Sequence, residues 1–238
     1  MPTVENLLLE KRRYGLKQTV SSFEKKLLKK GMPVQKIIGY IEMAGVLIDL
    51  SFDVLIPRYE TEELIYLVFD AYTKDAKLKI LDLCCGSGFI GLALKKHFFN
   101  SCLDLSDISL HSVLQSKLNA KNNKLNVNVI QSDLFENINN KYDIIVCNPP
   151  YISFNEQLDH SVLDFEPHLA LFANDDGLYF YKQILKQAPT YLKNTAKVFF
   201  EINPLHLNWW KEQKKFYDLE ILNDLSNRAR FVIWHYKK

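Results

Sequence analysis

Short apolar runs alternate along most of the chain with segments in which apolar residues recur at helical spacing. The runs predict strands at 79–83, 102–105, 127–130, 142–147 and 198–202, and a final pair at 217–222 and 230–236. Helices are predicted at 89–98, from 107 onward, at 175–192 and near 205–214. Strands that alternate with helices indicate an α/β fold with a mostly parallel sheet covered on both faces. The short link between the last two strands predicts antiparallel pairing for them.

The first 75 residues show a different pattern. Residues 19–30 predict a short basic helix that ends before Gly31. Its predicted apolar stripe consists of Val20, Phe23, Leu27 and Leu28. Residues 40–50 predict a hairpin that turns at Ala44-Gly45, and 60–72 predict a second helix. We therefore expect a small N-terminal helical and hairpin region at 1–75 and the main domain at 76–238. The sequence pattern of the hairpin fits either of these two regions.

The composition is that of a globular protein, because 47% of the 238 residues are apolar and 24% are charged. No apolar run approaches the ~18–20 residues that span a bilayer, and Met1–Lys17 lacks the apolar core of a secretory signal. We therefore expect a cytoplasmic protein with reduced thiols and no contact with a membrane. The histidines and cysteines do not show the spacing of metal ligands, so no metal site is predicted.

The net charge of +2 is distributed unevenly. Residues 1–45 contain nine Lys or Arg and four acids, which gives +5, whereas the remaining 21 bases and 24 acids give −3. One interpretation is a solvated helical face. The other is a basic arm that meets an acidic protein or an RNA-bound partner.

A glycine-rich segment at 81–91, LDLCCGSGFIG, links a predicted strand to a predicted helix. Gly86 and Gly88 permit a ligand to approach the backbone closely. Ligands of such sheets bind beyond the carboxyl ends of the strands. No Gly-Lys-Ser/Thr follows, which excludes a phosphate loop. A dinucleotide-binding fold is the natural rival, because an acid after the second strand, here Asp104, can hold a ribose in both.

A second motif, Asn148-Pro149-Pro150-Tyr151, follows the predicted strand 142–147 and so lies at the same edge of the sheet. The two prolines stiffen the loop. The Asn148 amide can donate and accept hydrogen bonds. Together with the Tyr151 ring, such a loop suits a planar –NH₂ group that must be aimed at an electrophile.

These two motifs resemble those of class I S-adenosylmethionine-dependent methyltransferases of the Asn-Pro-Pro-Tyr group. Residues 55–62, LIPRYETE, further resemble the "PRPETE" signature of the peptide chain release factor glutamine methyltransferases. Residues 165–171, FEPHLAL, with Asp176-Gly177-Leu178, resemble another stretch of that family. The resemblance covers about 33–236 and implies a Rossmann-like sheet with an antiparallel C-terminal strand.

The resemblance also implies which residues form the site. S-adenosylmethionine is expected to contact Asp82, Cys84, Cys85, Gly86, Ser87, Gly88, Asp104, Leu105, Asp133, Leu134 and Asn148. Among them, Asp104 would bind the ribose, and Asp133 and Leu134 would flank the adenine. The catalytic and substrate-holding loop would be Asn148, Pro149, Pro150 and Tyr151, with Leu55, Pro57 and Arg58 bordering the glutamine pocket. The implied partners are release factors, methylated on a glutamine amide, with no direct binding of nucleic acid.

The sequence departs from the family pattern at several positions. Cys84 replaces a glycine, Tyr59 a proline and Leu134 a common tryptophan, and the N-terminal region is shorter than usual. A cysteine at a position that needs a positive φ carries a modest cost. Three alternatives stay open: a ribosomal-protein glutamine methyltransferase, an adenine-N6 methyltransferase of DNA or RNA, and an inert cofactor-binding module.

Overall fold

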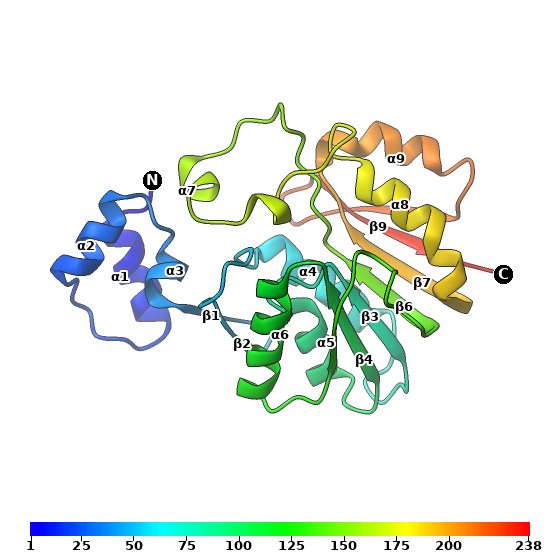
Figure 1. The fold of residues 1–238 in the computed structure, drawn as a ribbon, viewed down its shortest axis with the longest axis horizontal. Coiled ribbons are helices and arrows are strands. Elements are labelled where there is room, and N and C mark those ends of the chain that lie inside the picture. The colour runs from blue at the N-terminus through cyan, green and yellow to red at the C-terminus, as the bar shows by residue number, and fades with distance from the viewer.

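The computed structural model describes residues 1–238 and is built around a seven-stranded sheet (Figure 1). Its order is β5-β4-β3-β6-β7-β9-β8. The strands are β3 (Lys79–Leu83), β4 (Cys102–Asp107), β5 (Asn128–Gln131), β6 (Tyr142–Cys147), β7 (Leu192–Glu201), β8 (Leu219–Asn223) and β9 (Ala229–His235). The pairs from β5 to β7 are parallel, whereas β9 runs antiparallel to both β7 and β8. The predicted α/β class and the antiparallel C-terminal strand are therefore confirmed.

Helices cover both faces of the sheet because consecutive strand residues alternate between two hydrophobic clusters. Ile80 and Ile144 belong to the cluster under α4 (Tyr59–Asp70), α5 (Phe89–His97) and α6 (Leu110–Asn122). Leu81 and Ile145 belong to the cluster under α8 (Tyr179–Gln187) and α9 (Leu207–Gln213). The remaining turns are α7 (His160–Leu163) and the 3₁₀ segments His168–Ala170, Ala188–Tyr191 and Pro204–His206. None of the helices has both the length and the apolar character that crossing a bilayer demands.

Three N-terminal helices lie beside the sheet rather than on it (Figure 1): α1 (Val4–Arg13), α2 (Ser22–Lys29) and α3 (Val34–Ile38). Leu7, Leu28 and Val34 form their separate small core. The predicted helix at 19–30 is confirmed as α2, but Phe23 is 67% exposed, so its place in the predicted apolar stripe is wrong. A docking role for the basic N-terminal segment stays a prediction.

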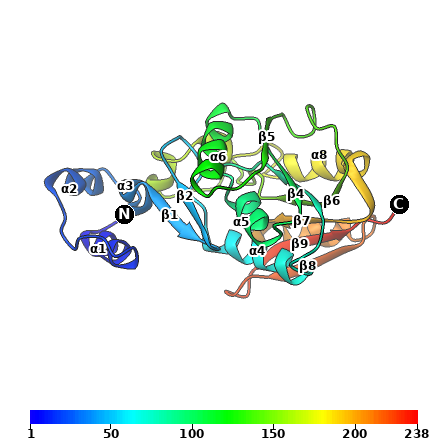
Figure 2. The same ribbon diagram turned by 90° about the horizontal axis from the view of Figure 1, so that it is seen from below.

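The predicted hairpin is formed by β1 (Tyr40–Met43) and β2 (Val46–Asp49), and it lies between the N-terminal helices and the main domain (Figure 2). Its buried side chains Ile41, Met43, Val46 and Ile48 belong to the large cluster under α5 and α6. The Asn119 side chain of α6 also accepts the Asp49 N–H and donates to the Asp49 carbonyl. We therefore propose that the chain divides between α3 and the hairpin, and that the hairpin belongs with the main domain.

Candidate active site

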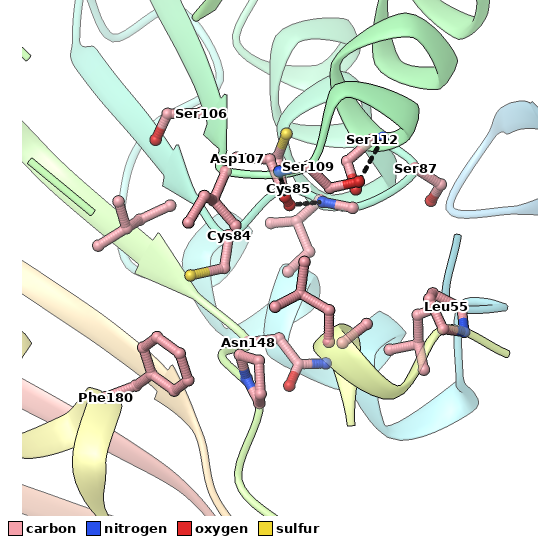
Figure 3. A pocket seen from close by; sticks show the side chains of 18 of the residues that line it. Leu55, Cys84, Cys85, Ser87, Ser106, Asp107, Ser109, Ser112, Asn148 and Phe180 are labelled. Atoms are coloured by element: carbon pink, nitrogen blue, oxygen red, sulfur yellow. Dashed lines mark hydrogen bonds between the residues drawn. The ribbon is translucent and has the colours of Figure 1, made fainter. Parts of the chain in front are cut away.

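A cavity opens at the carboxyl ends of β3, β4, β5 and β6 (Figure 3), the edge at which sheets of this type bind ligands. The ends of these strands and the loops after them contribute Cys84, Cys85, Gly86, Ser87, Ser106, Asp107, Ile108, Ser109, Ser132, Asp133, Leu134, Asn148 and Pro150. The outer side is formed by Leu55, Pro57, Thr61, Pro167, Leu169, Ala170, Tyr179 and Phe180. Both sequence motifs therefore meet in one cavity, with Asn148 across from Asp107 (Figure 3).

The predicted site residues divide into two groups. Those that line the cavity are Leu55, Pro57, Cys84, Cys85, Gly86, Ser87, Asp133, Leu134, Asn148 and Pro150. Those that do not are Arg58, Asp82, Gly88, Asp104, Leu105, Pro149 and Tyr151. Most residues of the second group support the first through hydrogen bonds or packing.

The glycine turn between β3 and α5 depends on left-handed backbone conformations. Cys84, Gly86 and Gly88 have φ of 62°, 53° and 80°. Cys84 therefore does adopt the positive φ for which a glycine is better suited, at a cost of roughly 1–2 kcal/mol. A Cβ at Gly91 would lie 2.8 Å from Leu105, so Leu105 packs against the first turn of α5. The prediction that Leu105 contacts the cofactor is therefore wrong.

The acid at the end of β4 is Asp107 rather than Asp104. Asp104 is 7% exposed and accepts hydrogen bonds from the Tyr142 hydroxyl, at 2.7 Å, and from the side chains of Asn128 and Asn140. It lies outside the cavity, so its predicted role at the ribose is wrong. β4 continues to Asp107, two residues beyond the predicted strand. There the carboxylate accepts the Gly86 N–H at 2.9 Å and borders the cavity (Figure 3).

Asp82 lies behind the glycine turn and is fully buried. Its Oδ2 accepts the Gly91 N–H at 2.8 Å, whereas its Oδ1 has no hydrogen-bond partner. Burial, together with the charge of Asp107, raises the pKa of Asp82 to about 7. A buried carboxyl group with one oxygen unpaired, close to a second acid, favours a ligand that carries positive charge nearby.

The raised pKa of Asp82 predicts an unusual dependence of stability on pH. The pKa in the folded state, about 7, exceeds the ~3.9 of an unfolded aspartate, so ionisation destabilises the fold as pH rises through this window. From pH 5 to pH 8, Asp82→Asn should therefore lose less unfolding free energy than the wild type, by roughly 2–4 kcal/mol. Urea unfolding at both pH values measures this difference. The exposed Asp75→Asn is the control, and equal losses in wild type and Asp82→Asn would contradict the prediction.

Asn148 is held from behind by α4. Its Nδ2 donates to the Thr61 Oγ1 at 3.2 Å, and the Thr61 hydroxyl donates to the Glu201 Oε2 at 2.7 Å. The Tyr151 hydroxyl donates to the other oxygen of Glu201 at 3.0 Å. The Tyr151 hydroxyl is therefore directed toward Glu201, at the end of β7, and a contact between the Tyr151 ring and the substrate stays a prediction.

The outer side of the cavity is held by an ion pair. The Arg58 Nη2 lies 2.5 Å from the Glu166 Oε1, and the Glu166 Oε2 accepts the Ile56 N–H at 2.8 Å. Glu166 is buried and precedes Pro167, which lines the cavity. Arg58 thus ties the segment of Leu55 and Pro57 to the segment after Glu166, and its contact with the substrate stays a prediction.

Sequence reasoning missed several residues that the structure brings to the site. These are Thr61, Asp107, Ile108, Glu166, Tyr179, Phe180 and Glu201. Thr61 and Glu166 lie inside the segments LIPRYETE and FEPHLAL, so the motifs themselves carried a signal for them. Glu201 lies in no quoted motif.

Known proteins match this chain over most of its length. Residues 65–165 match the family model "Methyltransferase small domain". The chain is 41% identical to the release factor glutamine methyltransferase of Lactococcus lactis, over 74% of this chain and 66% of that one. It is 39% identical to that of Streptococcus pneumoniae, over 84% and 75%, and 35% identical to that of Borreliella burgdorferi, over 92% and 81%.

Solved structures share the fold at low sequence identity. A methyltransferase from Pyrococcus furiosus aligns with a TM-score of 0.62 at 15% identity, covering 92% of this chain and all of that one. A Thermus thermophilus 16S rRNA methyltransferase bound to AdoMet and guanosine aligns with a TM-score of 0.62 at 17% identity. That alignment covers 84% of this chain and 50% of that one. At these identities the likeness establishes the class I methyltransferase fold alone.

Proposed function

Because the chain belongs to the release factor glutamine methyltransferase family, we propose that it transfers a methyl group from S-adenosylmethionine to a glutamine side-chain amide of peptide chain release factors. One observation carries the proposal: a single cavity has the glycine turn and Asp107 on one side and the Asn148 carboxamide on the other. As the resemblance implies, the glutamine lies in a Gly-Gly-Gln loop. Flanking glycines permit its backbone to reach a recessed Asn148.

The residues of the cavity fit S-adenosylmethionine, which supplies an electrophilic methyl group on a positively charged sulfur. Asp107 would present its carboxylate to the ribose hydroxyls, and Ile108 and Leu134 would provide apolar surface for adenine beside Asp133, all four being residues that line the cavity. The turn Cys84–Ser87 fits the methionine end. The uncompensated carboxyl group of Asp82 behind this turn favours the positive charge.

Asn148 orients the substrate nitrogen. An amide nitrogen is a weak nucleophile because its lone pair is delocalised into the carbonyl group. The Asn148 Oδ1 accepts one N–H of the substrate, and the Pro149 carbonyl is the predicted second acceptor. Holding the nitrogen in line with the methyl group can lower the barrier by up to ~7–11 kcal/mol. The proton would pass to solvent water after methylation, when the nitrogen is cationic and far more acidic, so no dedicated base is required.

The test is to incubate the protein with methyl-labelled S-adenosylmethionine and purified release factors, ribosomal proteins, RNA or DNA, and to map the label by mass spectrometry. We expect the label on the glutamine of the release factor loop. Label on a ribosomal-protein glutamine or on adenine would instead support one of the two alternative substrates. The names of the matched relatives favour neither alternative.

A further inference from the structure

We propose that Thr61 and Glu201 are positioning residues that fix the orientation of the Asn148 carboxamide, so that its oxygen and not its nitrogen faces the substrate. The effect of this orientation on turnover rests on the proposed function, because a substrate –NH₂ group needs a hydrogen-bond acceptor. Neither residue has to touch the substrate amide to act in this way.

The three residues come from separate elements that meet at the edge of the cavity. Thr61 lies in the first turn of α4, Asn148 follows β6, and Glu201 ends β7. Thr61 and Glu201 are only 4% and 1% exposed, so water does not compete for their hydrogen bonds. Both oxygens of Glu201 are engaged, one by the Thr61 hydroxyl at 2.7 Å and one by the Tyr151 hydroxyl at 3.0 Å.

The direction of the hydrogen bonds follows from the chemistry of a carboxylate, which accepts and does not donate. The Thr61 proton is therefore committed to Glu201, and the Thr61 oxygen is left as an acceptor. Of the two ends of the Asn148 carboxamide, only the –NH₂ can donate to it, as the 3.2 Å contact shows. The Oδ1 does not take part in this contact and is left to accept a hydrogen bond from a substrate in the cavity that Asn148 lines.

The direction of these bonds depends on an ionised Glu201, and each of its two carboxylate oxygens accepts a hydroxyl proton, from Thr61 and from Tyr151. Burial raises the pKa of Glu201, whereas the two hydroxyl donors and the charge of Arg230 oppose this rise. Glu60, on α4, is the acidic group that acts against ionisation. The Tyr181 hydroxyl donates to the backbone carbonyl of Glu201, at 3.0 Å, and does not use the carboxylate.

Four substitutions separate positioning from packing. Thr61→Val keeps the shape but removes the hydroxyl, and Thr61→Ser restores it. Glu201→Gln can donate to Thr61 and so permits the Asn148 carboxamide to turn over. Tyr181→Phe is the matched control, because it removes a buried hydroxyl bonded to the same residue through its backbone.

We expect Thr61→Val and Glu201→Gln to lower kcat on a release factor by about tenfold or more, with the dissociation constant of S-adenosylmethionine unchanged within about twofold. Thr61→Ser should recover most of the activity, and Tyr181→Phe should stay within about twofold of wild type. Thermal melting shows whether each variant is folded. If folded Thr61→Val retains wild-type kcat, or if Thr61→Ser is as impaired as Thr61→Val, the proposal is overturned.

A second measurement needs no substrate and therefore separates this proposal from the proposed function. In ¹⁵N-labelled protein, the side-chain –NH₂ signals of Asn148 are assigned by their absence in Asn148→Ala. Hydrogen exchange of these protons should be about tenfold or more faster in Thr61→Val than in wild type. Equal exchange rates overturn the positioning role, even if release factors are methylated. Faster exchange supports it, even if the labelled substrate proves to be different.

Discussion

Replacing Asn148 with alanine is expected to lower turnover by about 10²–10³-fold, the usual loss when one preorganised polar group is deleted from an active site. The substitution removes the acceptor that orients the substrate nitrogen. It leaves Asp107 and the glycine turn in place across the cavity. Affinity for S-adenosylmethionine should therefore change far less than kcat. Steady-state kinetics on an intact release factor, with calorimetry for the cofactor, measures both.

A matched control separates this effect from the general cost of removing an asparagine side chain. Asn128 lies outside the cavity and donates to Asp104 at 3.0 Å. Asn128→Ala should therefore leave kcat within about twofold of wild type, as for a polar contact that does not reach the substrate. Turnover in Asn148→Ala close to that of wild type would contradict the assignment of the loop after β6 as catalytic.

The elements that the sequence predicts best are those with strong local patterns. The strand at 142–147 is found at the predicted residues, and the hairpin turns at the predicted Ala44-Gly45. The helices α1 and α3 were not predicted, for physical reasons. In α1 the run Leu7-Leu8-Leu9 buries only Leu7 fully, so no apolar stripe marks the helix. α3 has five residues, which is too short to show a helical repeat.

In the site, too, the sequence predicts the residues of continuous motifs but not the contacts between residues that are distant in the chain. The glycine turn and the Asn148 loop are continuous segments, and both line the cavity. The sequence predicts Asp104 instead of Asp107 as the ribose-binding aspartate because the last residues of a strand have no distinct sequence pattern. In the structure β4 continues to Asp107. Thr61 and Glu201 are 140 positions apart. A contact between such distant residues exists only after α4 packs against the sheet, so the local sequence holds no sign of it.

Replacing Asp107 with alanine is expected to weaken S-adenosylmethionine binding by about 10–150-fold, equivalent to the ~1.5–3 kcal/mol of hydrogen bonds to a charged group. The carboxylate would accept ribose hydroxyls, and it already accepts the N–H groups of Gly86 and Ser109 at 2.9 Å. Its loss therefore removes a ligand contact and loosens the glycine turn together. The KM for the cofactor should rise, with kcat largely restored at saturation. Calorimetry and initial rates over a wide cofactor range test this.

Comparing variants of Asp104 and Asp107 shows which aspartate of β4 binds the cofactor. Asp104→Asn still occupies the site between Tyr142 and Asn140, but it loses the charge that these donors stabilise. Because Asp104 lies outside the cavity, its substitution should lower the melting temperature and leave cofactor affinity unchanged within about twofold. Asp107→Ala should show the opposite pattern, with the larger effect on affinity. Asp104→Asn could instead weaken cofactor binding as much as Asp107→Ala does. That result would contradict the assignment of Asp107 as the aspartate that binds the ribose, and with it the argument from the end of β4.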